Sequence, residues 1–518
     1  MKIFRVIKNY VLSGLIVITL FGCTDQKAKV IFVQLNDVYE IAPLGGGLYG
    51  GMARVAHVVD SLKAINPHTY LFMSGDFLNP SLLGTLKHEG ERIKGRQMIE
   101  VMNAMNFTMA TFGNHEFDLT YDDFQKRLNE STFDWVNTNC YHNAESGIKP
   151  FVRKSMEASQ PDTDADRLTQ IGQETIPEIK LLNVEHNGHT LDIGFFGITI
   201  PSNPKPYVHY ADMFAQAKYA VDSLKQTDVD LLVGLTHVNI DMDEEIARNN
   251  QDIDLILGGH DHTNMYVQEG NTLITKSDAN AKQIYVHELS YDFQSRQHTI
   301  ESKLIPITQN TPENQEVAQI VSRWDAILYK AVSQVSEAPN KVIYATEELW
   351  DGRDAQSRSV QTNLGQVITK AMAEAFDPPL DIAIVNGGSI RIDDFLTGGI
   401  TPLDFFRVLP FGDGVLKVQM TGDLLNEVLI YGKAQKGDGA YLQRYGINQD
   451  KNGQWLIGQK PIMANKLYWI ATSEFLMRGY DIPFLTPQHP GVKTVIYPNK
   501  GDITSDIRQS IIHNLTYE

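Results

Sequence analysis

Five short segments of this chain combine turn-forming residues with Asn, Asp or His side chains. Each segment follows an apolar run, which places its polar side chains at the end of a buried strand. The segments read LNDVY (35–39), SGD (74–76), GNHEFD (113–118), TH (236–237) and GGHDH (258–262). Together they offer oxygen and imidazole ligands but no thiolate, a set that suits a two-metal site for hydrolysing phosphate esters.

A pair of divalent ions answers a specific difficulty of phosphate-ester hydrolysis. The anionic phosphate repels nucleophiles, and two ions about 3.5–4 Å apart neutralise that charge and stabilise an in-line transition state. Such a site needs a carboxylate shared by both ions, completed by His, Asn and Asp side chains. The candidate ligands are Asp37, Asp76, Asn114, His237, His260 and His262.

The elements that must position these residues alternate between strands and helices. Residues 97–105 have the apolar spacing of a helix, and residues 141–180 are predicted as a polar surface excursion. Because ligands of α/β sheets bind at the carboxyl ends of the strands, we expect the five segments to meet there. The predicted buried strands are 30–33, 70–73, 107–112, 231–235 and 253–257.

A predicted connecting helix leads to a second α/β unit. The helix begins at Thr311, with Pro312 at its first position, and keeps apolar helical spacing to Val332. Further on, an amphipathic helix is expected at 364–376, ending before a Pro-Pro pair. Buried strands are predicted at 382–385 and 468–471.

Composition limits the classes of function. A chain of 518 residues suggests two or more domains, and 42% hydrophobic with 21% charged residues is typical of a folded protein. The formal net charge of −18 disfavours a nucleic acid polymer as partner. It does not exclude a small anionic substrate, because metal ions and arginines can override the global field locally.

The first 22 residues are predicted to be a signal peptide, with a basic start and an apolar stretch at 11–21 that is short for a bilayer span. The sequence LFGC (20–23) resembles a bacterial lipobox, which predicts a lipid on Cys23 of a protein exported to the periplasm or cell envelope. An ordinary signal peptide cleaved nearby is the alternative. With Cys23 lipidated, Cys140 has no disulfide partner.

The motifs, in this order, resemble the 5′-nucleotidase family and are similar to periplasmic UDP-sugar hydrolase/5′-nucleotidases. The resemblance covers roughly residues 29–518, and it implies an α/β protein of two domains. A metallophosphatase domain, a four-layer β-sandwich flanked by helices, would occupy 29–306. A linker helix would lie at 307–340, and an α/β nucleotide-binding domain at 341–518.

The resemblance also implies a role for each candidate in the first domain, with two divalent ions (Zn, Mn, Fe, Co or Mg) as cofactors. Asp76 would bridge the two metals. His115 would not be a ligand but would stabilise the transferring phosphate, oriented by Asp118. The first metal would also be bound by Asp37 and His262, and the second by Asn114, His237 and His260.

One position departs from the family pattern. The first motif of the family usually reads Asp-x-His, and Tyr39 stands where the ligand histidine would be. A phenol has a pKa near 10, so it is a poor ligand for Zn²⁺ or Mn²⁺ unless ionised. The first metal could then bind more weakly, take water instead or be an iron ion, or Tyr39 could hydrogen-bond a metal-bound water. We expect an active enzyme, since the other positions are intact.

The second half resembles the family's substrate site. Arg358 and Arg391 match arginines that grip the phosphate through their planar fork, and Arg353 lies one residue out of register with a third. In the family two aromatic rings sandwich the base, an interaction that tolerates different bases. The residues implied to contact the nucleoside are Asn386, Phe411, Phe475 and Asp481.

The implied activity is release of phosphate from nucleoside 5′-monophosphates by an exported, membrane-anchored hydrolase. Relatives suggest two alternative substrates for the same site, nucleotide-sugar diphosphates and 2′,3′-cyclic nucleotides. A nucleotide-binding lipoprotein without turnover is a third reading. Because site residues come from both domains, we expect the second domain to rotate about a hinge near residues 335–350.

Overall fold

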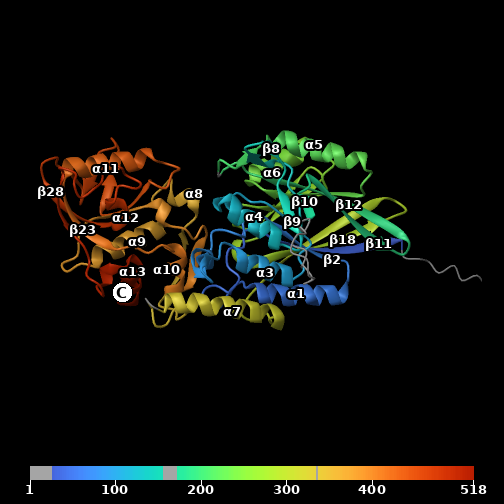
Figure 1. Ribbon diagram of the computed structural model, residues 1–518, viewed down its shortest axis with the longest axis horizontal. Coiled ribbons are helices and arrows are strands. Elements are labelled where there is room, and N and C mark those ends of the chain that lie inside the picture. Colours follow the sequence, from blue (N-terminus) through green and yellow to red (C-terminus); the bar gives the residue numbers. More distant parts are fainter. Residues whose placement is uncertain (1–25, 156–171, 203, 334–335, 518) are drawn as a thin grey trace, which may run out of the picture.

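The computed structural model describes residues 26–155, 172–202, 204–333 and 336–517. The predicted signal peptide and Cys23 lie outside the described residues, as does the middle of the predicted surface excursion. Figure 1 shows two bodies side by side, the amino-terminal one in blue to green and the carboxy-terminal one in orange to red.

The amino-terminal domain is built on two six-stranded sheets. The first has the order β19-β18-β1-β2-β5-β6 and the second the order β11-β12-β14-β15-β17-β16. In the first, β1, β2, β5 and β6 run parallel, and in the second β12, β14, β15 and β17 do. The first sheet consists of β1 (Lys27–Leu35), β2 (Thr69–Ser74), β5 (Met109–Thr111), β6 (Asp134–Trp135), β18 (Gln283–Asp292) and β19 (Gln297–Pro306). The second consists of β11 (Ile179–His186), β12 (His189–Thr199), β14 (Leu231–His237), β15 (Leu255–Gly259), β16 (Met265–Glu269) and β17 (Thr272–Lys276).

The two sheets pack face to face, and helices cover their outer faces. Phe32, Phe72 and Phe195 meet between the sheets, with the Phe72 and Phe195 ring centroids 5.1 Å apart. One outer face carries α1 (Met52–Ile65), α3 (Arg96–Ala104), α4 (Tyr121–Glu130) and α7 (Gln315–Val332), and the other carries α5 (Met213–Gln226) and α6 (Ile240–Asn249). The four-layer α/β sandwich implied by the resemblance is therefore confirmed, with each sheet buried between the other sheet and a layer of helices.

The connecting helix differs from the sequence prediction at its start. Helix α7 begins at Gln315, and Asn314 rather than Thr311 is its cap, because the Asn314 side chain accepts a hydrogen bond from the Val317 amide. The apolar stripe of α7 packs on α1 and α3, and Trp324 Nε1 donates to Glu100 at 2.8 Å. The helix is thus part of the amino-terminal core rather than a free spacer (Figure 1).

The carboxy-terminal domain is a five-stranded mixed sheet between helices. Its order is β24-β21-β28-β23-β29, with helices α9 and α13 on one face and α11 on the other. The strands are β21 (Ala383–Asn386), β23 (Val415–Thr421), β24 (Leu442–Tyr445), β28 (Leu467–Ser473) and β29 (Val492–Ile496). The helices are α9 (Asn363–Glu374), α11 (Gly422–Ala434) and α13 (Ile507–Tyr517), and a ribbon of β20 (Tyr344–Asp351) and β22 (Phe395–Ile400) leads to α10 (Pro402–Val408).

Part of the predicted surface excursion is regular structure. Its described parts form two small antiparallel sheets, whose short strands give too little alternation for a sequence pattern to show. One sheet pairs β9 (Val152–Ser155) with β10 (Gly172–Thr175). The other pairs β7 (Cys140–Ala144) with β8 (Gly147–Lys149) and with β13 (Val208–Tyr210), which lies beyond the predicted excursion. Cys140 is buried with a free thiol. Among the described residues, none of the helices combines the length and apolar character needed to cross a bilayer.

Candidate metal centre and substrate site

The five polar segments meet at one edge of the sandwich, because their strands run parallel. Asp37 and Asp76 lie just beyond β1 and β2, and His237 is the last residue of β14. His260 and His262 follow β15. The turn after β5 contains the short helix η1 (His115–Asp118). Residues separated by more than 200 positions in the sequence therefore lie in one site. This is the arrangement that the sequence predicts for side chains at the carboxyl ends of parallel strands.

One group of candidate ligands surrounds Asp76. Its Oδ2 atom lies 3.0 Å from His237 Nε2, and the ligand atoms of Asp76, His237 and His260 all lie within 4.8 Å of one another. The Ser74 carbonyl accepts a hydrogen bond from His237 Nδ1 at 2.8 Å, which fixes the tautomer and turns Nε2 toward the cluster. Asn114 is buried in the same turn as His115 and precedes η1 directly.

The chemistry of this group fits a divalent cation. Among the described residues, Asp76 Oδ2 and His237 Nε2 are buried polar atoms with no hydrogen-bond partner beyond their 3.0 Å contact with each other, and such atoms are costly unless something satisfies them. Burial disfavours a charged His237 ring, but the carboxylates of Asp76 and Asp37 outweigh it and raise the pKa of His237 to about 9. The site therefore attracts positive charge, which a metal ion would supply.

The other candidate ligands lie around Asp37. Its Oδ1 atom is 3.3 Å from His262 Nε2 and 3.8 Å from His237 Nε2, and its Oδ2 atom accepts the His260 amide at 2.9 Å. The Tyr39 hydroxyl lies 2.9 Å from His262 Nε2. Burial, followed by the charge of Asp76, raises the pKa of Tyr39 well above its usual value, so Tyr39 is held as a neutral phenol.

Backbone geometry at these residues is unusual. Asp37, Asp76, His260 and His262 have positive φ angles of 54°, 55°, 84° and 60°. Residues other than glycine rarely adopt this left-handed region, and such strain gathers at functional sites, where the surrounding structure enforces it. Four of the six candidate metal ligands share this backbone conformation.

Sequence reasoning missed the residue that ties two of these turns together. The Glu116 carboxylate accepts backbone amides from Asp76 (2.9 Å), Phe77 (2.8 Å), Leu78 (3.0 Å) and Gly113 (2.6 Å). Glu116 is fully buried and belongs to the GNHEFD motif. An acidic residue between His and Phe, with no role as a metal ligand, was the feature of the sequence that could have indicated this positioning role.

A buried lysine plays a similar part for the GGHDH turn. Lys276 Nζ donates to the carbonyl of Gly259 at 2.9 Å and to Asp261 Oδ2 at 2.6 Å, and it forms an ion pair with Asp243 at 2.8 Å. It lies at the end of β17, and no feature of the sequence marked it.

His115 and Asp118 form a pair at the rim of the cluster. Asp118 Oδ2 accepts from His115 Nδ1 at 2.7 Å, so His115 Nε2 faces the site. Burial acts to lower the pKa of His115, but the charge of Asp76 and the bond to Asp118 raise it well above its usual value. Arg391 approaches from the carboxy-terminal domain, 3.9 Å from Asp118 Oδ2.

The predicted nucleoside contacts gather in the carboxy-terminal domain. Asn386 Nδ2 donates to Asp481 Oδ2 at 2.7 Å, and the Phe475 amide donates to Asp413 Oδ2 at 2.5 Å, which ties the two aromatic turns together. The Phe411 side chain is 71% exposed and therefore free to stack on a ligand. Tyr480, also exposed, lies against the Phe475 ring at 5.1 Å.

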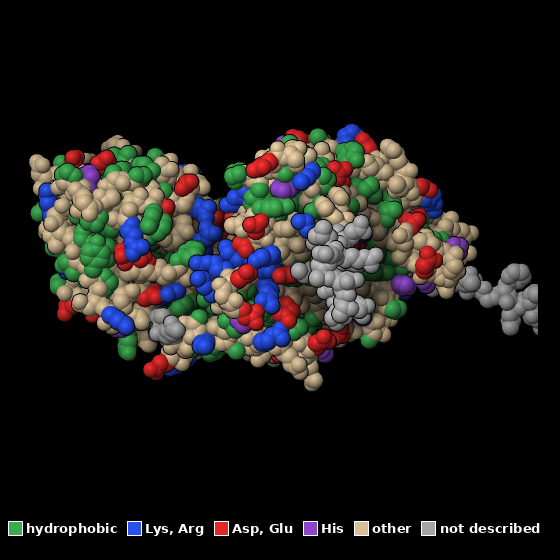
Figure 2. All heavy atoms as spheres, viewed as in Figure 1, with side chains coloured by type: hydrophobic (Ala, Val, Ile, Leu, Met, Phe, Trp, Pro, Cys, Tyr) green, Lys and Arg blue, Asp and Glu red, His purple; other side chains and the backbone are tan. Residues whose placement is uncertain are grey.

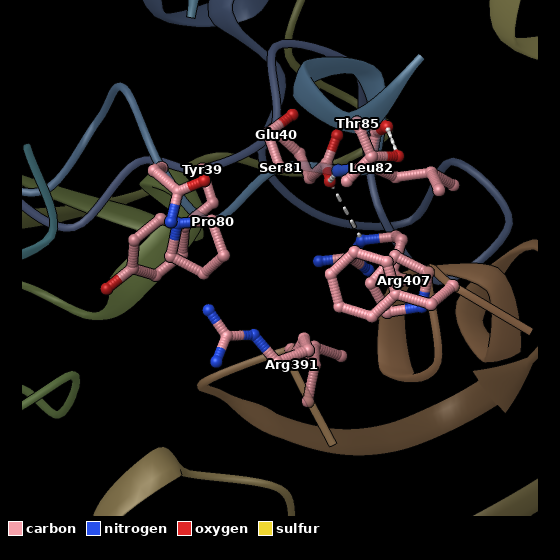
Figure 3. Close-up of a pocket in the computed structure, with 12 residues that line it drawn as sticks. Tyr39, Glu40, Pro80, Ser81, Leu82, Thr85, Arg391 and Arg407 are labelled. Atoms are coloured by element: carbon pink, nitrogen blue, oxygen red, sulfur yellow. Dashed lines mark hydrogen bonds and ion pairs between the residues drawn. The ribbon is translucent and has the colours of Figure 1, made fainter. Parts of the chain in front are cut away.

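The three predicted arginines are not equivalent. Arg391 extends toward Tyr39 and Pro80 across a small pocket between the domains (Figure 3), close to the metal cluster. Arg358 forms an ion pair with Asp354 at 2.8 Å. Arg353, the arginine one residue out of register with the family motif, donates to Asp351 at 2.8 Å and stacks on the Phe395 ring at 4.4 Å. Its guanidinium is therefore already engaged in contacts within its own domain.

This fold and cluster define a class, the metal-dependent phosphoesterases. The family model described as calcineurin-like phosphoesterase matches residues 31–264, and the model described as 5′-nucleotidase, C-terminal domain, matches residues 342–486. With both domains in this order, the chain belongs to the 5′-nucleotidase family, which confirms the resemblance seen in its motifs.

Individual relatives agree with that assignment. The chain is 27% identical to the trifunctional nucleotide phosphoesterase protein of Bacillus subtilis over 83% of its own length but only 31% of that protein. It is 26% identical to human 5′-nucleotidase, over 83% of this chain and 78% of the relative. The 5′-nucleotidase precursor of Thermus thermophilus shares the fold, with a TM-score of 0.63, 20% identity and coverage of 95% and 96% of the two chains.

Proposed function

We propose that this protein is an exported hydrolase that releases phosphate from nucleoside 5′-monophosphates with two divalent metal ions. One observation carries the proposal. The cluster around Asp76 and Asp37 faces, across the domain junction, an arginine that suits a phosphate, and the pocket at this junction is also lined by the exposed Phe411, which suits a base. Figure 2 shows Lys and Arg side chains along this junction, interspersed with Asp and Glu side chains.

The chain's own residues account for binding and proton delivery. Two divalent ions, when bound, would neutralise the phosphate and make water a better nucleophile at neutral pH. Arg391 would hold phosphate oxygens through its planar fork. His115 Nδ1–H donates to Asp118, and the raised pKa of His115 keeps the ring doubly protonated, so Nε2 also carries a proton that can pass to the leaving nucleoside oxygen.

We also propose that substrate entry needs movement of the carboxy-terminal domain. The segment after Arg391 lies on the cluster, with Asp393 Oδ2 at 3.2 Å from His115 Nε2, where a transferring phosphate would have to sit. The hinge predicted near 335–350 begins at residues outside the described ones and continues into β20.

Phosphate release from a panel of nucleotides tests the function. AMP, UMP, UDP-glucose and 2′,3′-cAMP are compared after chelation and again after Mn²⁺, Zn²⁺ or Mg²⁺ is added back. We expect release from the monophosphates only with metal, and none from Asp76→Asn, while the exposed Glu288→Gln behaves as wild type. Nucleotide binding without phosphate release under every condition would show a non-catalytic binding protein instead.

A second activity is supported by one relative. The Bacillus subtilis protein is called a trifunctional nucleotide phosphoesterase, so action of this site on a diphosphate or cyclic ester is the alternative. The same panel separates the possibilities, since faster turnover of UDP-glucose or 2′,3′-cAMP than of AMP would favour the alternative.

The export proposal rests on the sequence of residues 1–23. We propose that a lipid on Cys23 anchors the mature chain to a membrane of the cell envelope. Cys23→Ala should move the protein from the membrane fraction to the soluble fraction of cells. Equal membrane retention of this variant would contradict lipid anchoring.

A further inference from the structure

A carboxylate from the carboxy-terminal domain lies within the candidate metal centre. Asp393 follows Arg391 by two residues, and its side chain is almost fully buried. Its Oδ2 atom is 3.2 Å from His115 Nε2, 3.5 Å from the Tyr39 hydroxyl and 3.7 Å from His262 Nε2. None of the motifs in the sequence assigned this residue a role.

The spacing around His262 is that of ligands sharing one ion. Two donor atoms, each about 2.1 Å from a common metal, lie about 3–4 Å apart at ordinary bond angles. Asp37 Oδ1 and Asp393 Oδ2 lie at 3.3 Å and 3.7 Å from His262 Nε2, and both lie 3.5 Å from the Tyr39 hydroxyl. Each of the two carboxylate oxygens, from Asp37 and from Asp393, is therefore at ligand spacing from His262 Nε2, beside the phenol that replaces the family's imidazole.

We propose that Asp393 is a ligand of the first metal ion, supplied by the second domain in place of the histidine that Tyr39 replaces. A carboxylate is the better substitute for an imidazole here, because it is negative at neutral pH and needs no ionisation of the phenol. This inference rests on the metal centre of the proposed function, but it is independent of which phosphate ester is hydrolysed.

Contacts with both domains hold Asp393 and its neighbour Asp394 in place. Its Oδ1 atom accepts the Asp354 amide at 2.7 Å, and its φ angle of 45° matches the strained backbone of the other candidate ligands. The neighbouring Asp394 pairs with Lys282 at 2.6 Å across the domain junction.

One side chain connects this segment with the first motif. Asn280 Nδ2 donates to Asp394 Oδ2 at 2.9 Å, while its Oδ1 accepts the Tyr39 amide at 3.1 Å. The backbone of Tyr39 and the segment bearing Asp393 are therefore set by the same residue, and the approach of Asp393 to the cluster is built into the domain contact.

The proposal couples metal retention to domain closure. With the domains arranged as they are, Asp393 completes the shell of the first metal. When the second domain moves to admit substrate, the carboxylate leaves, and phosphate oxygens can take the position beside His115. The first ion is then held most firmly by the closed protein.

Metal binding to the full chain provides the test, without relying on turnover. Metal content per chain after dialysis, and Mn²⁺ and Zn²⁺ affinities from chelator competition, are measured for Asp393→Ala and Asp393→Asn. The control is Asp423→Asn, an equal charge change on an exposed residue of α11. We expect one of the two ions to bind about tenfold more weakly or worse in Asp393→Ala, with the second ion unaffected.

A second, independent test measures the same metal affinities in the Tyr39→His background. If Asp393 replaces the missing imidazole, the loss caused by Asp393→Ala should be clearly smaller in the Tyr39→His background. Unchanged affinities for both ions in Asp393→Ala, or equal losses in both backgrounds, would overturn the inference while leaving the proposed function intact. Absence of bound metal in the wild type would instead refute the proposed function. If Asp393→Ala does not fold, Asp393→Asn, which keeps the side-chain volume, decides.

Discussion

Replacing Glu116 with Gln tests whether one buried carboxylate holds the metal-binding turns together. Each oxygen of Glu116 accepts two backbone amides, Oε1 those of Phe77 and Leu78, and Oε2 those of Asp76 and Gly113. A Gln side chain keeps only one accepting oxygen, so two buried amides lose their acceptor and face an NH₂ group. At about 1–3 kcal/mol for each unsatisfied group, Glu116→Gln should cost about 2–6 kcal/mol of stability.

The measurement combines thermal unfolding with metal content after dialysis. Because two of the amides belong to the turns that carry Asp76 and Asn114, we expect a lower unfolding midpoint together with loss of bound metal. Glu288→Gln is the matched control, since Glu288 is exposed and pairs with Lys303 on the surface, where such pairs contribute little. A Glu116→Gln protein with wild-type midpoint and metal content would refute the positioning role.

Three further outcomes are expected. Gly113→Ala should abolish metal binding in a folded protein, because a Cβ at this position would overlap Asp76 Oδ1, and retention of both ions would contradict the packing. Burial raises the pKa of Asp325 from 3.8 to about 6, so the stability it contributes is complete below pH 3.8 and lost as the pH rises through 6. Asp325→Asn should therefore be more stable than wild type by about 1–3 kcal/mol at pH 8 and equal to it near pH 4, as measured by denaturant unfolding at both values. Joining Lys282→Cys to Asp394→Cys with a short cleavable bismaleimide should stop nucleotide turnover until the linker is cut, and unchanged turnover would refute domain movement.

Local sequence signals were sufficient for the strands that lead to the site. β1 and β2 were predictable because apolar runs end at Asp-bearing turns, whereas the four-layer sandwich was implied only by the resemblance to a known family. The sequence was less reliable for helix boundaries, which depend on single capping contacts. The start of α7 moved from Thr311 to Asn314, because both residues can cap a helix and only the packing of Trp324 on Glu100 fixes the register.

The sequence by itself determined the ligand chemistry of this protein, because the types of side chain and the turns that present them are local properties. It also determined the order of the two domains. Only the tertiary structure decided which groups converge. Tyr39 and Asp393 are 354 residues apart, yet their polar atoms lie 3.5 Å from each other. The roles of Glu116 and Lys276 were assigned from their buried partners, and for Lys276 no feature of the sequence gave a signal. The physical reason is that a ligand shell is closed by packing between distant elements and domains, and no periodicity in the chain records that packing.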